Sequence, residues 1–371
     1  MKPLRIGIIG GSMAGLFAGS LLQRDGHDVT IFERSSVGLG GRGAGLVPQQ
    51  EVYSFLERVG LEYAARVGVS AFERVYLDRY GNVAETVSTP QTQISWDYLY
   101  NSVASLIDDD RYILNSNAVS VADSAEGAEI YFGDGSSINA DLVIGADGLG
   151  SIVRKSLFPH HFENSYAGYV AWRGLLKEND VPPDASLLLE RFSFYVTKGN
   201  HALGYLVPGP NGEMDPGRRR YNWVWYRKVQ QVDLVATFSD KDDAHHKFSL
   251  PRGGLSTERR DALRLSAAEN LPPQFVEVVR AENEPSIQGI FDYDAPSMIG
   301  RSVALIGDAA YVARPHTAMG VSKAAGDAMT LADALRDSDN LSNALRLFSR
   351  TREPVGRDIV NFGRRLGATS I

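Results

Sequence analysis

The chain has 371 residues, of which 43% are hydrophobic and 22% charged, proportions that suit a globular protein with a sizeable core. Its formal net charge of −7 argues against a nucleic-acid partner, because nucleic-acid binders carry a basic face. The absence of cysteine excludes disulfides, thiolate metal ligands and a cysteinyl link to a cofactor.

The start of the chain, its hydropathy and its histidines bear on whether the protein is secreted, spans a membrane or binds a metal. The chain enters a predicted strand at Leu4, which leaves no room for a signal peptide, so we expect a cytoplasmic protein. No run of 18 apolar residues occurs, so we expect no membrane span. The histidine pairs at 160–161 and 245–246 are adjacent residues, which face opposite ways on a strand, so we predict no metal site.

The first predicted elements are a strand, a tight turn, a helix and a second strand over residues 4–33. The turn, Gly10-Gly11-Ser12-Met13-Ala14-Gly15, follows the pattern G-x-G-x-x-G with Ser12 in place of the second glycine. Such a turn places a pyrophosphate at a helix N-terminus, where free N–H groups and the helix dipole favour an anion. Glu33 ends the second strand, where an acid can bind ribose hydroxyls. This unit predicts a dinucleotide site that suits FAD and NAD equally.

Two later segments also place an aspartate at the end of a buried strand. The segment DLVIGADGLGSIVR, residues 141–154, runs from a strand through Asp147-Gly148 into a turn and a helix. The segment ALIGDAAYVARPHTAMGVSKAAGDA, residues 304–328, passes through Gly307-Asp308, and a helix of small residues begins about ten residues later. Carboxyl ends of parallel strands share one sheet edge, where ligands bind.

Together the three motifs resemble the single-component (class A) FAD-dependent aromatic monooxygenases, and the resemblance spans essentially the whole chain. YAGYVAWRG, residues 166–174, and ARPHTAMGVSKAAGDA are similar to the 2,6-dihydroxypyridine 3-monooxygenase branch. Three positions depart from the common family pattern. Tyr311 replaces a histidine, Ala318-Met319-Gly320 replaces G-Q-G, and Trp96 stands near the position of an arginine.

The resemblance implies a non-covalently bound FAD, with NADH or NADPH as a transient co-substrate. It implies that Asp308 accepts from the ribityl chain and that N–H groups near Met319 face the flavin pyrimidine. Arg42 resembles the family arginine near the pyrophosphate and the nicotinamide; a solvated loop arginine is the alternative. The residues expected to hold FAD are Gly10, Ser12, Met13, Ala14, Gly15, Glu33, Arg34, Arg42, Val119, Asp147, Gly307, Asp308, Pro315, Ala318, Met319 and Gly320.

The middle of the chain reads as short β-rich runs separated by Gly, Pro and Asn. We therefore predict an α/β (α+β) fold, a Rossmann-like FAD-binding domain with an inserted antiparallel β-sheet substrate domain. The three consecutive arginines at 218–220, called the arginine strip, are interpreted as the solvent-exposed start of a strand. The expected parts are the FAD-binding domain at 1–71, 91–160 and 281–371, a β-hairpin at 72–90 that joins the substrate domain, and the substrate domain at 161–280.

Four residues are candidates for chemistry on a ring. His316 follows Pro315 beside the expected flavin and can deprotonate a substrate hydroxyl, since its unperturbed pKa is about 6.5. Tyr205 is the second catalytic candidate, and Tyr195 and Tyr169 are further substrate contacts on predicted strands. The alternatives are a loop histidine bonded to backbone and core tyrosines with satisfied hydroxyls.

The function implied by the resemblance is hydroxylation of a small electron-rich aromatic ring with NAD(P)H and O2, through a flavin C4a-hydroperoxide. The branch similarity favours a hydroxylated pyridine or a related N-heteroaromatic ring. Two alternatives stay open: an FAD-dependent dehydrogenase or reductase on the same fold, and a non-catalytic flavin-binding sensor. A homodimer is an expectation from the family.

Overall fold

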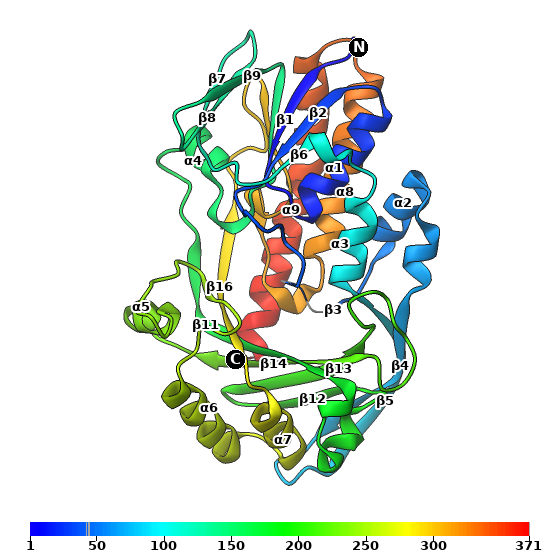
Figure 1. Cartoon of the computed structure of the whole chain (residues 1–371), viewed down its shortest axis with the longest axis vertical. Coiled ribbons are helices and arrows are strands. Elements are labelled where there is room, and N and C mark those ends of the chain that lie inside the picture. Colours follow the sequence, from blue (N-terminus) through cyan, green and yellow to red (C-terminus); the bar gives the residue numbers. More distant parts are fainter. Residues whose placement is uncertain (42, 44, 371) are drawn as a thin grey trace.

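The computed structural model describes residues 1–41, 43 and 45–370. The chain forms two parts that pack against each other, an upper part and a lower part in the view of Figure 1. The upper part is built on a parallel sheet whose strand order is β17-β10-β1-β2-β6. Its strands are β1 (Arg5–Ile9), β2 (Asp28–Phe32), β6 (Tyr112–Ile113), β10 (Leu142–Gly145) and β17 (Val303–Leu305). Such strands read as continuous apolar runs because both sheet faces are covered.

Helices cover one face of the parallel sheet and a small antiparallel sheet lies on the other side (Figure 1). The helices of this part are α1 (Met13–Arg24), α2 (Gln50–Val59), α3 (Trp96–Ala104), α8 (Gly320–Asp337) and α9 (Leu341–Ser370), whereas the short α4 (Ile152–Leu157) lies beside the small sheet (Figure 1). The small sheet consists of β7 (Ala118–Asp123), β8 (Ala128–Phe132) and β9 (Ser137–Ala140). One apolar core joins α1, α8 and the parallel strands.

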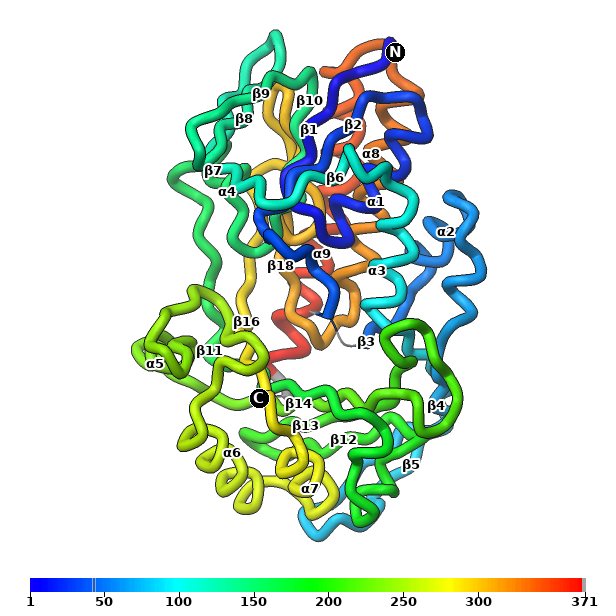
Figure 2. Tube along the Cα trace, viewed as in Figure 1, coloured from blue at the N-terminus to red at the C-terminus, as the bar shows by residue number. Residues whose placement is uncertain are grey.

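The lower part is a large, mainly antiparallel sheet with the order β15-β16-β11-β14-β13-β12-β4-β5-β3 (Figure 2). Its strands are β3 (Gly45–Leu46), β4 (Gly68–Leu77), β5 (Val83–Ser95), β11 (Ser165–Lys177), β12 (Phe192–Thr197), β13 (Asn200–Val207), β14 (Arg220–Lys228), β15 (Ser249–Leu250) and β16 (Ser286–Asp294), and β18 (Tyr311–Val312) pairs with β16. Around it lie α5 (Leu234–Phe238), α6 (Thr257–Asn270) and α7 (Pro273–Ala281).

Strand pairing divides the side chains of the large sheet between two faces. Trp223, Trp225 and Tyr221 point to one face, where they pack with apolar residues of α6 and α7. We call the opposite face, which carries Arg173, Tyr205 and their neighbours in register, the inner face, because it is turned toward the parallel-sheet part.

The predicted fold class is confirmed: a Rossmann-like half is combined with a large antiparallel sheet. The hairpin expected at 72–90 is longer, since β4 and β5 run from Gly68 to Ser95. Strand β16 extends the large sheet to Asp294, past the boundary expected at residue 280. The division into domains otherwise stays a prediction. Among the described residues, no helix is long and apolar enough to cross a membrane.

Candidate active site

The three motifs meet at the carboxyl edge of the parallel sheet. An ideal Cβ on Gly307 would lie 2.9 Å from the Cβ of Ala14, so the third motif packs directly on the start of α1. Arg154, from the second motif, donates from Nη1 to the carbonyl oxygens of Asp308 and Ala309, both at 3.3 Å. Segments about 300 residues apart in sequence thus form one surface.

The glycine turn has the shape that a pyrophosphate requires. An ideal Cβ on Gly10 would lie 2.5 Å from the carbonyl oxygen of Ala146, and one on Gly15 would lie 1.9 Å from the carbonyl oxygen of Gly10. Only glycine fits either position. Ser12 is the N-cap of α1, is extended (φ −82°, ψ −171°) and makes no capping hydrogen bond with its side chain. The first N–H groups of α1 are therefore available to an anion.

A cavity of about 290 Å³ opens beside this turn and brings together five of the predicted cofactor residues: Gly10, Ser12, Glu33, Arg34 and Asp147. It is also lined by residues that were not predicted to hold the cofactor, namely Ile9, Phe32, Leu39, Trp96, Ser116, Asn117, Ala118, Ala146, Gly148, Gly150 and Ile152. Val119 is not among the lining residues; its side chain is exposed, and the neighbouring Ala118 lines the cavity instead.

The two acids of this cavity serve different purposes. Glu33 is buried and accepts hydrogen bonds from the backbone N–H of Gly11 at 2.9 Å and of Ser35 at 2.8 Å, which leaves lone pairs for ribose hydroxyls. Asp147 accepts from Ser151 Oγ at 2.5 Å and from the N–H of Ile152 at 2.6 Å. Burial raises the pKa of Asp147. Asp147 therefore stabilises the turn.

The third motif leaves the Asp308 carboxylate and the first N–H groups of α8 open, whereas the N–H of Ala318 donates to the carbonyl oxygen of Pro315 at 3.0 Å and that of Met319 donates to Thr317 Oγ1 at 3.2 Å. The Asp308 side chain is 48% exposed and is available to a hydroxyl group. Helix α8 begins at Gly320 after Ala318, which is left-handed at φ 53°, and Met319, whose side chain caps nothing. Pro315 and Ala318 are exposed. The residues present therefore fit FAD, with the free ends of α1 and α8 offering N–H groups.

The loop before β3 is anchored to the large sheet by a buried ion pair. Arg220 Nη1 lies 2.8 Å from Asp97 Oδ2, and Asp97 Oδ1 accepts from the N–H of Gly41 at 3.0 Å. The predicted contact Arg42 lies outside the described residues. The arginine strip at 218–220 is solvated only at Arg218, whose side chain is 65% exposed, because Arg219 is also buried and binds Glu178.

His316 lies in a cluster of rings on the inner face. Its Nε2 is 2.9 Å from Tyr169 Oη, and its ring centroid is 4.3 Å from that of Tyr226 and 5.6 Å from that of His201. Burial, with smaller effects of His201 and Arg314, lowers the pKa of His316 to about 3. His316 is therefore neutral near pH 7 and is a much weaker base than its sequence suggested.

The inner face also lines a cavity of about 890 Å³ between the large sheet and the loop around Gly41. Arg173 lines it, donates to Gln288 Oε1 at 2.8 Å and forms no ion pair among the described residues. Asn222 is fully buried, and neither of its amide atoms has a hydrogen-bond partner among the described residues. Tyr205 pairs with Asn222 in register, and its hydroxyl is 3.4 Å from the carbonyl oxygen of Gly45.

Tyr195 does not belong to this group. It pairs with Ala202, so it points to the other face, where it packs with Trp225 under α6 and α7. Arg173 and Asn222 were not predicted as site residues from the sequence. A polar residue within the aromatic run YNWVWY was the available signal for Asn222, since buried strands otherwise exclude an amide.

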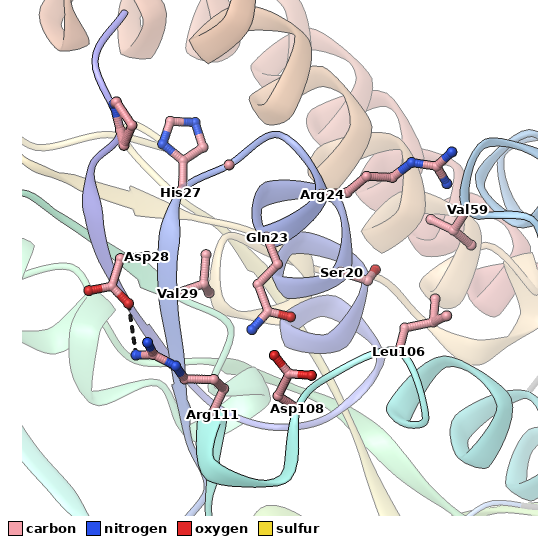
Figure 3. A pocket seen from close by; sticks show the side chains of 12 residues that line it. Ser20, Gln23, Arg24, His27, Asp28, Val29, Val59, Leu106, Asp108 and Arg111 are labelled. Atoms are coloured by element: carbon pink, nitrogen blue, oxygen red, sulfur yellow. Dashed lines mark ion pairs between the residues drawn. The ribbon is translucent and has the colours of Figure 1, made fainter.

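Another cavity, of about 610 Å³, lies at the far end of α1 from the glycine turn (Figure 3). Arg24 and His27 line it near an exposed ion pair between Arg111 and Asp28 at 2.7 Å. Helix α1 has 12 residues, so this cavity is about 18 Å from the turn. None of the described residues that line it was predicted to belong to the site.

Comparison with known proteins agrees with this geometry. Residues 8–80 match a family described as NAD(P)-binding Rossmann-like domain, and residues 166–292 match one described as FAD binding domain-like. The 2,6-dihydroxypyridine 3-monooxygenase of Paenarthrobacter nicotinovorans is 31% identical over 360 residues, which cover 96% of this chain and 89% of that protein. The chain belongs to the single-component FAD-dependent aromatic monooxygenases.

Two further relatives extend the comparison. The solved 2,6-dihydroxypyridine-3-hydroxylase from Arthrobacter nicotinovorans superimposes with a TM-score of 0.92 at 30% identity, covering 99% of this chain and 92% of that chain. The 3-amino-4-hydroxybenzoate 2-monooxygenase of Streptomyces cremeus is 27% identical over 379 residues, 98% of this chain and 87% of that protein. The family resemblance is therefore confirmed. The cofactor of this monooxygenase is FAD, its electron donor is NAD(P)H, and it acts on an aromatic compound with O2.

Proposed function

We propose that this monooxygenase hydroxylates a small, hydroxylated N-heteroaromatic ring such as a hydroxypyridine. The proposal is carried by two polar side chains that line the same cavity: Arg173 is half-buried and forms no ion pair among the described residues, and the buried amide of Asn222 has no hydrogen-bond partner among them. A hydroxypyridine in its lactam form offers a C=O and an N–H side by side, which match the N–H₂ and C=O of an asparagine amide. The relatives named above act on rings that carry hydroxyl groups.

Arg173 is proposed to favour the ring as its oxyanion, because a nearby cation lowers the pKa of a hydroxyl group. The same effect acts on this chain's own hydroxyls: burial raises the pKa of Tyr205, and the charge of Arg173 opposes that rise. An oxyanion makes the ring more electron-rich. Bound FAD supplies the activated oxygen, and the ring must be held facing it with water excluded.

His316 and Tyr205 are assigned to holding the ring. Because the pKa of His316 is lowered to about 3, its imidazole is neutral and serves as a hydrogen-bonding group, coupled to Tyr169 Oη. With a base this weak, substrate deprotonation depends on the positive charge of Arg173. The Tyr205 hydroxyl is held 3.4 Å from the carbonyl oxygen of Gly45, on the same face of the sheet as Asn222. These roles for His316, Tyr205 and Tyr169 are proposals, as are the contacts of the predicted cofactor residues.

The test compares rings that differ by one atom. FAD-loaded protein is mixed with NADH or NADPH, and 2,6-dihydroxypyridine is compared with resorcinol, which has the same hydroxyl arrangement without the ring nitrogen. We expect the pyridine to stimulate nicotinamide oxidation and O2 uptake at least tenfold more strongly, and mass spectrometry to show a product heavier by one oxygen. Equal stimulation by resorcinol, salicylate and 4-hydroxybenzoate would refute the N-heteroaromatic assignment.

The same assay separates the two alternatives. A dehydrogenase or reductase would turn over without O2 uptake or an oxygenated product. A flavin-binding sensor would retain FAD while no ring changed the rate of nicotinamide oxidation. Sedimentation at several protein concentrations would test the homodimer that the family resemblance suggests.

A further inference from the structure

Lys323 is a buried cation directly behind the cofactor acid of the third motif. It lies in the first turn of α8, and its side chain is 0% exposed. Its Nζ is 3.3 Å from Asp308 Oδ1, close enough for an ion pair, yet it makes no aligned hydrogen bond with any described residue. An ammonium group has three donors, so burial without an aligned acceptor is costly unless its charge is needed there.

The other buried charges near Lys323, those of Asp327 and Arg352, form an ion pair with each other. Asp327, one turn along α8, accepts from Arg352 Nε at 2.8 Å and from the N–H of Gly307 at 3.0 Å. Arg352 also donates to the carbonyl oxygen of Lys323 at 3.3 Å. Asp327 and Arg352 therefore balance each other, and the charge of Lys323 is left for Asp308.

Asp308 has opposite surroundings on its two sides. Its carboxylate lies 3.3 Å from the Nζ of the buried Lys323 on one side, while 48% of the side chain is exposed. No described residue donates a hydrogen bond to either carboxylate oxygen. A free carboxylate beside a cofactor that carries a pyrophosphate would be repelled, since like charges nearby disfavour binding.

We propose that Lys323 is a positioning residue for FAD: it fixes the Asp308 carboxylate from behind and neutralises its charge, so that Asp308 can accept from a cofactor hydroxyl. Lys323 is fully buried, so it acts through Asp308 and does not touch FAD itself. The inference depends on the FAD site and not on which ring is the substrate. Failure of the hydroxypyridine proposal would leave it standing.

The experiment is a double-mutant cycle that measures FAD affinity rather than turnover. FAD-free protein is prepared as wild type, Lys323→Met, Asp308→Asn and the double variant, and FAD is titrated by quenching of flavin fluorescence. We expect Lys323→Met to raise the Kd for FAD about 10- to 100-fold, the range for losing a partner of a charged hydrogen-bonding group. In the Asp308→Asn background the same change is expected to alter the Kd less than threefold.

Two controls keep the result interpretable. Lys228→Met removes the same charge from an exposed position on β14 and is expected to leave the Kd unchanged. Lys323→Gln keeps a donor without the charge and is expected to give an intermediate Kd; if Lys323→Met does not fold, the cycle is completed with Lys323→Gln. Equal losses in the wild-type and Asp308→Asn backgrounds, or a Kd for Lys323→Met within twofold of wild type, would overturn the proposal.

Discussion

Acidification should destabilise this protein through His201. The side chain is 8% exposed, neither ring nitrogen has a hydrogen-bond partner among the described residues, and the ring centroid lies 5.4 Å from that of Tyr226. Burial lowers the pKa of His201 to about 4. The unfolded chain has a histidine pKa of about 6.5, so between pH 6.5 and 4 the unfolded state binds more protons and folding stability falls as pH falls.

The size of the effect follows from the two pKa values. Between pH 7 and pH 5, His201 alone should cost about 2 kcal/mol of unfolding free energy. The assay is urea unfolding of FAD-free protein at pH 7, 6 and 5, for wild type and for His201→Phe, which keeps a ring but cannot titrate. We expect the variant to lose about 2 kcal/mol less than wild type over this window, and the exposed His245→Gln control to behave as wild type.

Parallel pH profiles for wild type and His201→Phe would refute the reasoning, because they would mean that His201 accepts a proton in the folded state without penalty. The pKa of His316 is lowered too, in part by His201, so some acid sensitivity should persist in the variant. A variant that lost all of it would show that His316 titrates normally once its neighbour is removed.

Three further predictions concern single residues of the site. Ala318 is left-handed at φ 53°, so Ala318→Gly should raise the unfolding free energy by about 1 kcal/mol in urea titrations, and a fall would show that the backbone is unstrained. Arg154 is buried and donates to the carbonyl oxygens of Leu149, Asp308 and Ala309. Arg154→Met should therefore lower the unfolding free energy by about 3 kcal/mol or more and weaken FAD binding. A loss below about 1 kcal/mol would show that the carbonyls find other donors. In steady-state assays, Asn222→Leu should raise the KM for 2,6-dihydroxypyridine at least tenfold (about 1.4 kcal/mol) and leave the KM for resorcinol nearly unchanged. Equal effects on the two rings would argue against a contact between the Asn222 amide and a lactam.

The motif-bearing part of the fold could be predicted because its signals are local. An apolar strand that ends in glycine or aspartate and leads into a helix specifies both an element and the sheet edge at which it ends. Strands β1, β10 and β17 are neighbours in the parallel sheet, which is why Gly10, Asp147 and Asp308 come together. No distant contact had to be known to place them.

The inner face could not be predicted to the same depth because it depends on pairing between distant strands. Phe194 and Tyr195 are both aromatic, so alternation along β12 does not reveal which of them faces the cofactor half; the pairing of Tyr195 with Ala202 decides it. The arginine strip looked solvated because its acidic partners are far away in sequence: Glu178 lies 41 residues from Arg219, and Asp97 lies 123 residues from Arg220.

At two of the positions that depart from the family pattern, Tyr311 and Trp96, a glycine lies against the aromatic ring and leaves room for it. Tyr311, which stands where relatives carry a histidine, is fully buried, and an ideal Cβ on Gly356 of α9 would lie 2.2 Å from its ring. Trp96, which stands near the position of the family arginine, stacks on Tyr100 at 5.0 Å, and an ideal Cβ on Gly43 would lie 2.3 Å from it.

In each case a larger aromatic ring occupies volume that a Cβ on the facing residue would need, so the pair must change together. Restoring histidine at 311 alone would leave a void beside Gly356, and adding a methyl group at Gly356 alone would collide with Tyr311. Trp96 and Gly43 are coupled in the same way, and Trp96 also lines the cavity beside the glycine turn. Each aromatic ring is therefore matched in volume to its facing glycine, and a variant that restores the family residue at one position should be interpreted only together with a change at that glycine.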